Sequence, residues 1–132
     1  MSTGPLRLLL LLVMLLVPPG LSAAGSWTGQ AGPVRAVMVD RGMDSMLMRP
    51  PPSVTAGTVQ EVRWRFGVPA GQAVVAWLCH QDGCVPLDSR SGITQALNGV
   101  PAATPLHFRF ALAPGQRRAV QVSDLQVIVN YR

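Results

Sequence analysis

The chain has 132 residues and a formal net charge of +5, and all 11 of its basic side chains are arginines. The absence of lysine excludes a Schiff-base lysine, a P-loop lysine and a Ser–Lys nucleophile pair. The 6 acidic residues and 2 histidines are scattered and match no catalytic motif such as G-x-S-x-G or H-E-x-x-H, so we do not expect an enzyme.

The first feature of the chain is a short apolar run. Residues 8–17, LLLLLVMLLV, would form a helix of roughly 15 Å, about half of the ~30 Å needed to cross a bilayer. Helix breakers follow at 18–20, and then come the small residues Ser22, Ala23 and Ala24. We therefore predict a cleaved signal peptide over residues 1–24, cut after Ala24 or alternatively after Ala23, and hence an exported protein. An uncleaved anchor is the rival interpretation.

The remaining 108 residues, 25–132, are enough for a single domain. Proline and glycine interrupt them too often for helices of normal length, whereas several segments alternate apolar and polar residues as half-buried strands do. In chain order the expected strands are 34–39, 45–48, 59–66, 73–79, 84–87, 93–97, 106–112, 119–122 and the final alternating stretch that ends at Arg132. Seven to nine short strands favour an all-β sandwich of immunoglobulin-like size, with a small barrel as the alternative.

The alternation also predicts which side chains face the core. Val62, Trp64 and Phe66 share one face of their strand, and Arg63 and Arg65 share the other. In the same way, Leu106, Phe108, Phe110 and Leu112 are expected to point inward, with His107 and Arg109 outward. On the last strand, Leu125, Val127, Val129 and Tyr131 fall on one face.

The chain has two cysteines, Cys79 and Cys84, in the sequence LCHQDGC. Asp82-Gly83 is a turn signal, and a hairpin closing there would set the cysteines opposite each other at disulfide distance. The C-x4-C spacing fits neither thioredoxin-type redox motifs nor haem attachment. A zinc site would need further ligands, and the other histidine, His107, is on a strand distant in sequence. We predict a disulfide.

A second constellation is the group of four methionines Met38, Met43, Met46 and Met48. Thioethers bind Cu(I), so a copper-binding protein is an alternative function, although methionine is also a common filler of irregular cores. Alternation would put Met46 and Met48 on one strand face. We expect no cofactor, and no metal unless this cluster provides the site.

The positive charge does not indicate a nucleic-acid partner. Arg63 with Arg65, and Arg117 with Arg118, form pairs rather than a continuous stripe, and stacking aromatics are few. A solvated face, or a weak contact with anionic protein or lipid, is the preferred interpretation. After signal cleavage we expect no stable insertion into a membrane.

The C-terminal sequence QVIVNYR, residues 126–132, resembles the end of the FlhE family of periplasmic flagellar proteins. Further similar stretches occur in the same order, namely Trp27, VRWRF at 62–66, the LCxxxxCVxLD frame at 78–88, SGxT at 91–94 and VPAxxPLxF at 100–108. The methionine cluster and the three prolines at 50–52 are not part of the family pattern.

The resemblance implies a periplasmic, non-enzymatic accessory of flagellar assembly with rod or export-apparatus proteins as partners. Such a protein would act as a chaperone or plug that limits proton leakage through the export apparatus, prevents premature flagellar assembly in the periplasm and affects swarming. We further expect the last strand to be a sheet edge that receives an extended partner segment through Val127, Ile128, Val129, Asn130, Tyr131 and Arg132.

Overall fold

The computed structural model describes residues 24–132, so the predicted signal peptide, apart from Ala24, lies outside the described residues. Those residues form nine strands: β1 (Gly25–Ala31), β2 (Val34–Ala36), β3 (Met43–Asp44), β4 (Val59–Gly67), β5 (Val74–His80), β6 (Gly83–Leu87), β7 (Ser91–Thr94), β8 (His107–Leu112) and β9 (Val120–Tyr131). In this part of the chain no helix is long and apolar enough to span a membrane.

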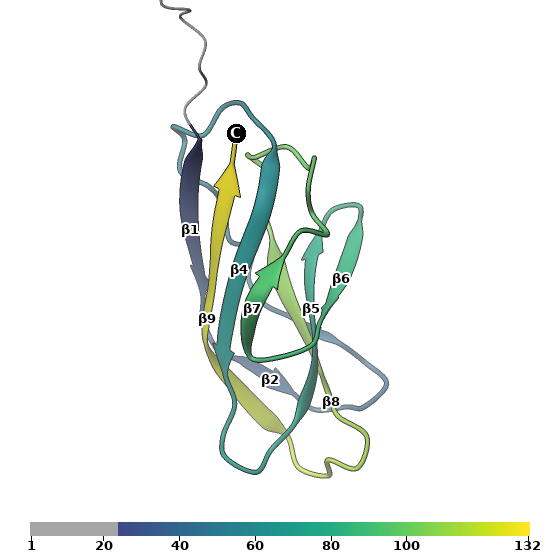
Figure 1. Cartoon of the computed structure of the whole chain (residues 1–132). Helices are drawn as coiled ribbons and strands as arrows, with labels where there is room; N and C mark the ends of the chain where they lie inside the picture. The colour runs from purple at the N-terminus through teal and green to yellow at the C-terminus, as the bar shows by residue number, and fades with distance from the viewer. Residues whose placement is uncertain (1–23) are drawn as a thin grey trace, which may run out of the picture.

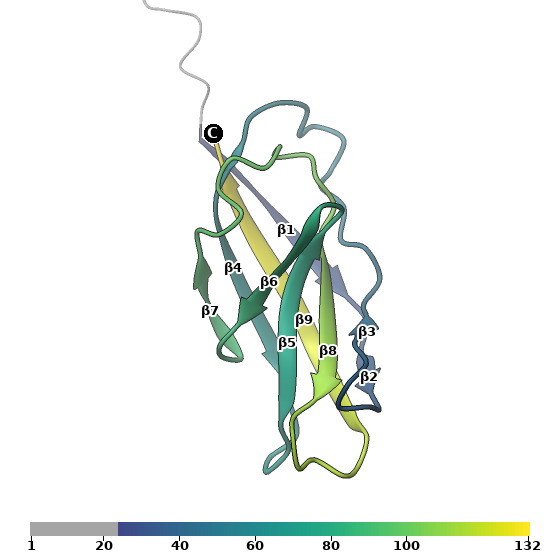
Figure 2. The same cartoon turned by 90° about the vertical axis from the view of Figure 1, so that its right-hand side faces the viewer.

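The strands are arranged in two sheets, which face each other across the core (Figures 1 and 2). The first sheet has the order β1-β9-β4-β7, and β2 pairs with the beginning of β9. The second sheet has the order β3-β8-β5-β6, and the pairings between strands are antiparallel. This arrangement confirms the predicted β-sandwich.

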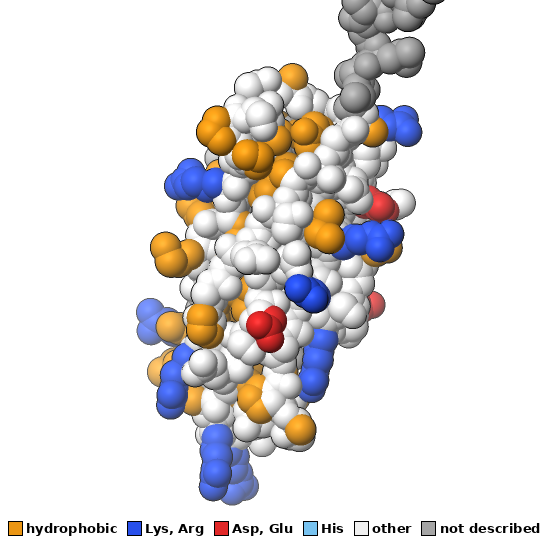
Figure 3. Space-filling view, turned by 90° about the vertical axis from the view of Figure 1, so that its left-hand side faces the viewer, with side chains coloured by type: hydrophobic (Ala, Val, Ile, Leu, Met, Phe, Trp, Pro, Cys, Tyr) orange, Lys and Arg blue, Asp and Glu red, His pale blue; other side chains and the backbone are white. Residues whose placement is uncertain are grey.

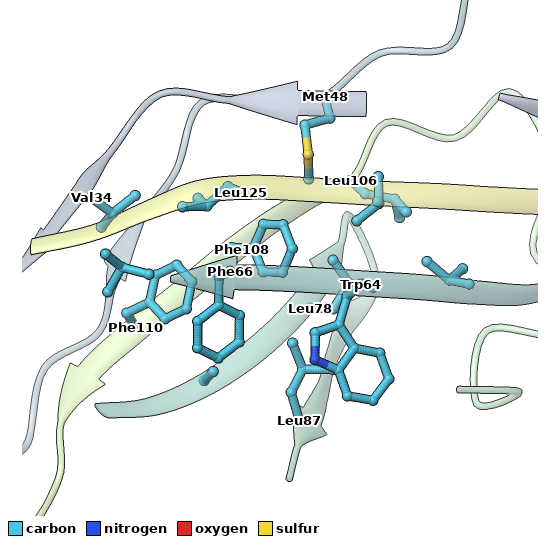
Figure 4. Packing of buried hydrophobic residues seen from close by; sticks show 14 of the residues in the cluster. Val34, Met48, Trp64, Phe66, Leu78, Leu87, Leu106, Phe108, Phe110 and Leu125 are labelled. Atoms are coloured by element: carbon cyan, nitrogen blue, oxygen red, sulfur yellow. The ribbon is translucent and has the colours of Figure 1, made fainter. Parts of the chain in front are cut away.

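Side-chain burial follows the predicted alternation. Val62, Trp64 and Phe66 of β4 are buried, and so are Phe108 and Phe110 of β8. The three phenylalanine rings meet between the sheets: the Phe66 and Phe110 centroids are 5.0 Å apart at 71°, and those of Phe108 and Phe110 are 5.6 Å apart. Figure 4 shows these rings between the strands of the two sheets. They form the centre of the hydrophobic core.

Strand β9 changes its buried face part of the way along. Val120 and Val122 are buried at even positions, whereas Leu125, Val127 and Val129 are buried at odd positions. The change occurs at Ser123-Asp124, where Asp124 has a φ of 55°, a left-handed conformation that aspartate tolerates better than most residues. This irregularity lets one continuous strand pair with β2 before it and with β1 after it.

Strand β1 was not predicted from the sequence. Its residues, GSWTGQA, include two glycines and only one large apolar side chain, Trp27, so no alternation is visible. Seven residues of β1 nevertheless pair with β9. Trp27 is buried, and its Nε1 donates a hydrogen bond of 3.0 Å to the carbonyl of Ala102. Backbone pairing with β9, rather than the strand propensity of its own residues, makes this segment a strand.

The predicted disulfide between Cys79 and Cys84 is confirmed. The two residues are directly paired in the β5–β6 hairpin, and Gly83 in the turn has a φ of 153°, within the region that favours glycine. Because the cysteines are only five positions apart, the loop-entropy model assigns the bond about 2 kcal/mol of stabilisation.

We therefore expect the double variant Cys79→Ala/Cys84→Ala to remain folded and to lose about 2 kcal/mol of unfolding free energy in urea titrations. The reduced wild-type protein should unfold at the same denaturant concentration as the variant. A fully unfolded variant would show that the bond has a larger role than closing one hairpin.

Candidate interaction surfaces

The predicted partner-binding strand is not a sheet edge. In β9, Val127 and Val129 are fully buried, and the strand pairs with β1 on one side and with β4 on the other. The backbone groups of β9 are therefore engaged within the sheet and cannot receive an added strand. The prediction of an edge was wrong because order along the chain does not fix order within a sheet.

The strands at the ends of the described sheets are β1 and β7 in the first sheet and β3 and β6 in the second. Three of them are poor templates for strand addition. β3 has two residues and β7 has four, and Pro86 within β6 has no N–H to donate. The fourth, β1, has seven residues and pairs with β9 on one side.

The last residues of the predicted site instead border a polar groove of about 520 Å³. Asn130, Tyr131 and Arg132 line it together with side chains of β4 and of the segment after β7, including Glu61, Gln95 and Asn98. Asn130 Nδ2 donates a hydrogen bond of 3.3 Å to Glu61 Oε1. We call this surface the terminal groove.

The floor of the terminal groove is held firmly. The backbone of Arg132 exchanges two hydrogen bonds with Thr58, at 2.6 and 3.0 Å. The ring of Tyr131 covers Gly25 so closely that a Cβ there would lie 2.5 Å from the ring. The chain terminus is therefore fixed, and the exposed amides of Gln95 and Asn98 beside it suit hydrogen bonding to a polar or extended peptide segment.

A second polar cluster lies on the outer face of the other sheet. Arg109 Nε and Nη2 donate hydrogen bonds of 2.7 and 3.2 Å to the two carboxylate oxygens of Asp44. His107 Nε2 lies 3.7 Å from Asp44 Oδ2, too far for a hydrogen bond, and is buried without a partner. Register pairs His107 with Cys79, and Arg109 Nη1 is 3.6 Å from Cys84 Sγ.

This cluster was not predicted from the sequence. His107 was expected to lie far from the cysteines, but strands β5 and β8 are neighbours in the sheet although they are distant in sequence. The alternation of β8 was the available signal, because it puts His107 and Arg109 on one face. The partner Asp44 had no such signal, since β3 is only two residues long.

The Arg109 guanidinium beside Asp44 lowers the pKa of that carboxyl, mainly through the two hydrogen bonds and against a smaller opposing effect of burial. A lowered folded-state pKa stabilises the fold above the unfolded value, which is near 3.8, and this contribution is lost as the pH falls through the folded value. The pair is well exposed to solvent, so its contribution to stability is roughly 0.2–1 kcal/mol.

The variant Asp44→Asn should therefore be slightly less stable than wild type at pH 7, by less than about 1 kcal/mol. The difference should decrease as the pH falls below 3.8 and disappear once the pH is below the lowered folded-state pKa, where the wild-type carboxyl is protonated. Urea unfolding at both pH values measures it. A difference that persisted unchanged in acid would mean that packing, not charge, makes Asp44 stabilising.

The methionines do not form one cluster. Met48 is buried at 2% exposure, whereas Met46 is 79% exposed, so the prediction that they share a strand face was wrong. The chain is irregular between β3 and the isolated bridge of Met48 with Leu106. Met43 and Met46 line a common hollow, but Met48 could join them only by leaving the core. Among residues 24–132 no group of three His, Cys, Asp or Glu side chains could hold a metal ion.

The fold is a two-sheet β-sandwich with a polar groove beside the C-terminus and a polar cluster on the outer face of the second sheet. The family model "Flagellar protein FlhE" matches residues 36–132. Flagellar protein FlhE of Escherichia coli (strain K12) is 36% identical over 128 residues, covering 92% of this chain and 98% of that protein. The protein of the same name from Salmonella typhimurium is 37% identical over 131 residues, covering 92% and 97%.

A solved structure agrees with these sequence matches. The crystal structure of FlhE has a TM-score of 0.72 to this chain and 33% sequence identity, and the match covers 84% of this chain and 99% of that one. The chain belongs to the FlhE family of flagellar proteins. The predicted family is thereby confirmed, and with it a role associated with the flagellum.

Proposed function

We propose that this protein is a non-enzymatic accessory of flagellar assembly that works in the periplasm as a chaperone or plug. In this role it limits proton leakage through the flagellar export apparatus, prevents premature assembly of flagella in the periplasm and thereby affects swarming. Membership of the FlhE family supports the flagellar part of the proposal. The Cys79–Cys84 disulfide supports an oxidising compartment.

The observation that carries the contact mechanism is the position of the terminal sequence. The stretch 126–132 that marks the family resemblance supplies Asn130, Tyr131 and Arg132 to the terminal groove. Since the backbone of β9 is already paired, recognition falls to side chains. In this proposal, an extended segment of a rod or export-apparatus protein lies in the groove and hydrogen-bonds to the amides of Asn130, Gln95 and Asn98.

The test uses flagellated cells that lack their own copy of the gene and receive variants in its place. The groove variant Gln95→Ala/Asn98→Ala alters exposed side chains, and Gln121→Ala, an exposed residue at the other end of β9, is the matched control. Three readouts are measured: cytoplasmic pH for proton leakage, microscopy of the cell envelope for flagella in the periplasm, and the spread of colonies on swarming agar.

We expect wild type and the control to restore all three readouts and the groove variant to fail, although it reaches the periplasm in normal amount. Full restoration by the groove variant would exclude the groove as the contact site. Cells without the gene that neither leak protons nor assemble periplasmic flagella would contradict the plug and chaperone roles themselves. Recovery of the protein from the cytoplasm with free thiols would contradict the location.

A further inference from the structure

One segment of the surface is unusually apolar. Eight large hydrophobic side chains are classed as exposed among residues 24–132, and six of them fall between positions 37 and 47. They are Val37 (43%), Met38 (47%), Val39 (48%), Met43 (38%), Met46 (79%) and Leu47 (49%). We call residues 37–47 the apolar strap. A concentration of this kind on a small domain marks a contact site rather than scattered surface apolar residues.

The position of the strap explains its exposure. It leaves β2, which pairs with the first sheet, and crosses to β3, which pairs with the second. Backbone hydrogen bonds fasten it, from the Leu112 amide to the Met38 carbonyl and from the Ser45 amide to the Phe108 carbonyl. Two polar side chains of the strap add to them, since Asp44 accepts from Arg109 and Ser45 Oγ accepts from the Phe108 amide. The apolar side chains are therefore held on the outside of the sandwich, at the side where β2 and β3 lie in Figure 2.

Arginines surround and interrupt the strap. Arg35, Arg41 and Arg49 lie within or beside it in sequence, and none has an ion-pair partner in the described residues. The turn that carries Arg117 and Arg118 adjoins it, because Ala36 pairs with Val120 just after that turn. In Figure 3, hydrophobic and arginine side chains alternate along the left margin. This margin is the side of the molecule on which β2 and β3 lie at the right of Figure 2.

The acidic residues of the strap do little to offset this charge. Asp44 is held by Arg109, which leaves only the carboxylate of Asp40 against the five arginines. The surface therefore combines apolar side chains with an excess of positive charge. Methionine and arginine also occur often at interfaces between proteins, so composition alone does not choose the partner. The excess of positive charge does, because surfaces that lie on membranes combine exposed apolar side chains with basic ones that contact anionic lipids.

We propose that the apolar strap docks this protein reversibly on an anionic phospholipid bilayer. The methionine, leucine and valine side chains enter the boundary between headgroups and acyl chains, and the arginines contact the lipid phosphates. The inference goes beyond the proposed function, since it requires a lipid surface but no flagellar component. The chain docks on the membrane without crossing it.

The first test is co-sedimentation of the purified, exported protein with vesicles. We expect binding to vesicles that contain phosphatidylglycerol, weak binding to pure phosphatidylcholine, and a decline of binding as salt is raised. The variant Met46→Ser/Leu47→Ser should lose most of the binding. The variant Arg41→Gln/Arg49→Gln should weaken binding to anionic vesicles by roughly tenfold or more, and its binding should depend less steeply on salt.

The matched control is Arg63→Gln/Ile93→Ser, which removes one arginine and one half-exposed isoleucine from the outer face of the first sheet. It should bind like wild type. All variants carry the N-terminus that cells produce, so any contribution from residues upstream of the described chain is common to all of them. An equal loss in the control, or no preference of the wild type for anionic vesicles, would overturn the proposal.

A gain-of-signal probe covers the case in which the strap variants misfold. Met46→Trp places an indole at the most exposed apolar position, and its emission should shift to shorter wavelength on addition of phosphatidylglycerol vesicles. Ile93→Trp should not shift. Binding without a shift of the tryptophan at position 46 would contradict insertion of the strap.

Discussion

Replacing Phe108 with alanine is expected to cost about 3–5 kcal/mol of unfolding free energy. The side chain is fully buried and packs against Phe66 and Phe110, with centroid distances of 6.2 and 5.6 Å. It lies between the sheets, so its removal leaves a cavity that neither sheet can fill without shifting. A domain of this size has about 5–15 kcal/mol in total, so the variant should be close to unfolding at 37 °C.

Urea unfolding followed by tryptophan fluorescence measures this effect. The control is Ile93→Ala, because Ile93 is large and apolar but half exposed on β7, and this change should cost no more than about 0.5 kcal/mol. If the two variants lost similar amounts, the phenylalanine cluster would not be the centre of the core.

The second large effect is expected at the centre of β9. Val129→Glu should prevent folding at neutral pH, because Val129 is fully buried between the sheets and its strand is paired on both sides. A carboxylate there would have no partner, and an unpaired buried charge destabilises a protein by several kcal/mol. Far-UV circular dichroism and solubility report the result.

The adjacent position provides the control for this prediction. Ile128 is on the outer face of the same strand and is paired in register with Arg63 of β4. Ile128→Glu should therefore be neutral or slightly stabilising, by roughly 0.2–1 kcal/mol from the cross-strand charge pair. Equal damage from both substitutions would mean that β9 is not a central strand with one buried face.

Some of this structure was predictable because its causes are local. Alternation in β4 and β8 identified the buried side chains, since a strand turns successive residues to opposite sides. The Cys79–Cys84 bond was predictable because a short hairpin fixes which residues face each other. Conversely, β1 has no alternation. In β9 the buried positions change from even to odd numbers at Asp124, so the sequence predicted two strands where the structure has one.

The interaction surfaces depend on long-range pairing and were only partly predictable. The terminal stretch borders a groove at Asn130–Arg132, but it is not the sheet edge that was predicted, because the neighbours of β9 are β1 and β4. A role for these residues in partner binding stays a prediction. The cluster of Asp44, His107 and Arg109 could not be predicted, since 63 or more residues separate Asp44 from its partners.

The sequence by itself determined that this protein is built of strands, which faces of most strands are buried, which cysteines pair, and to which family it belongs. Only the tertiary structure decided which strands lie at the centre of each sheet, that Met48 is in the core while Met46 is exposed, and where the arginines meet the apolar strap. The physical reason is that alternation and hairpin register act between residues close in sequence. Sheet order and surface clusters arise from contacts between residues far apart in sequence, and a local sequence pattern does not reveal such contacts.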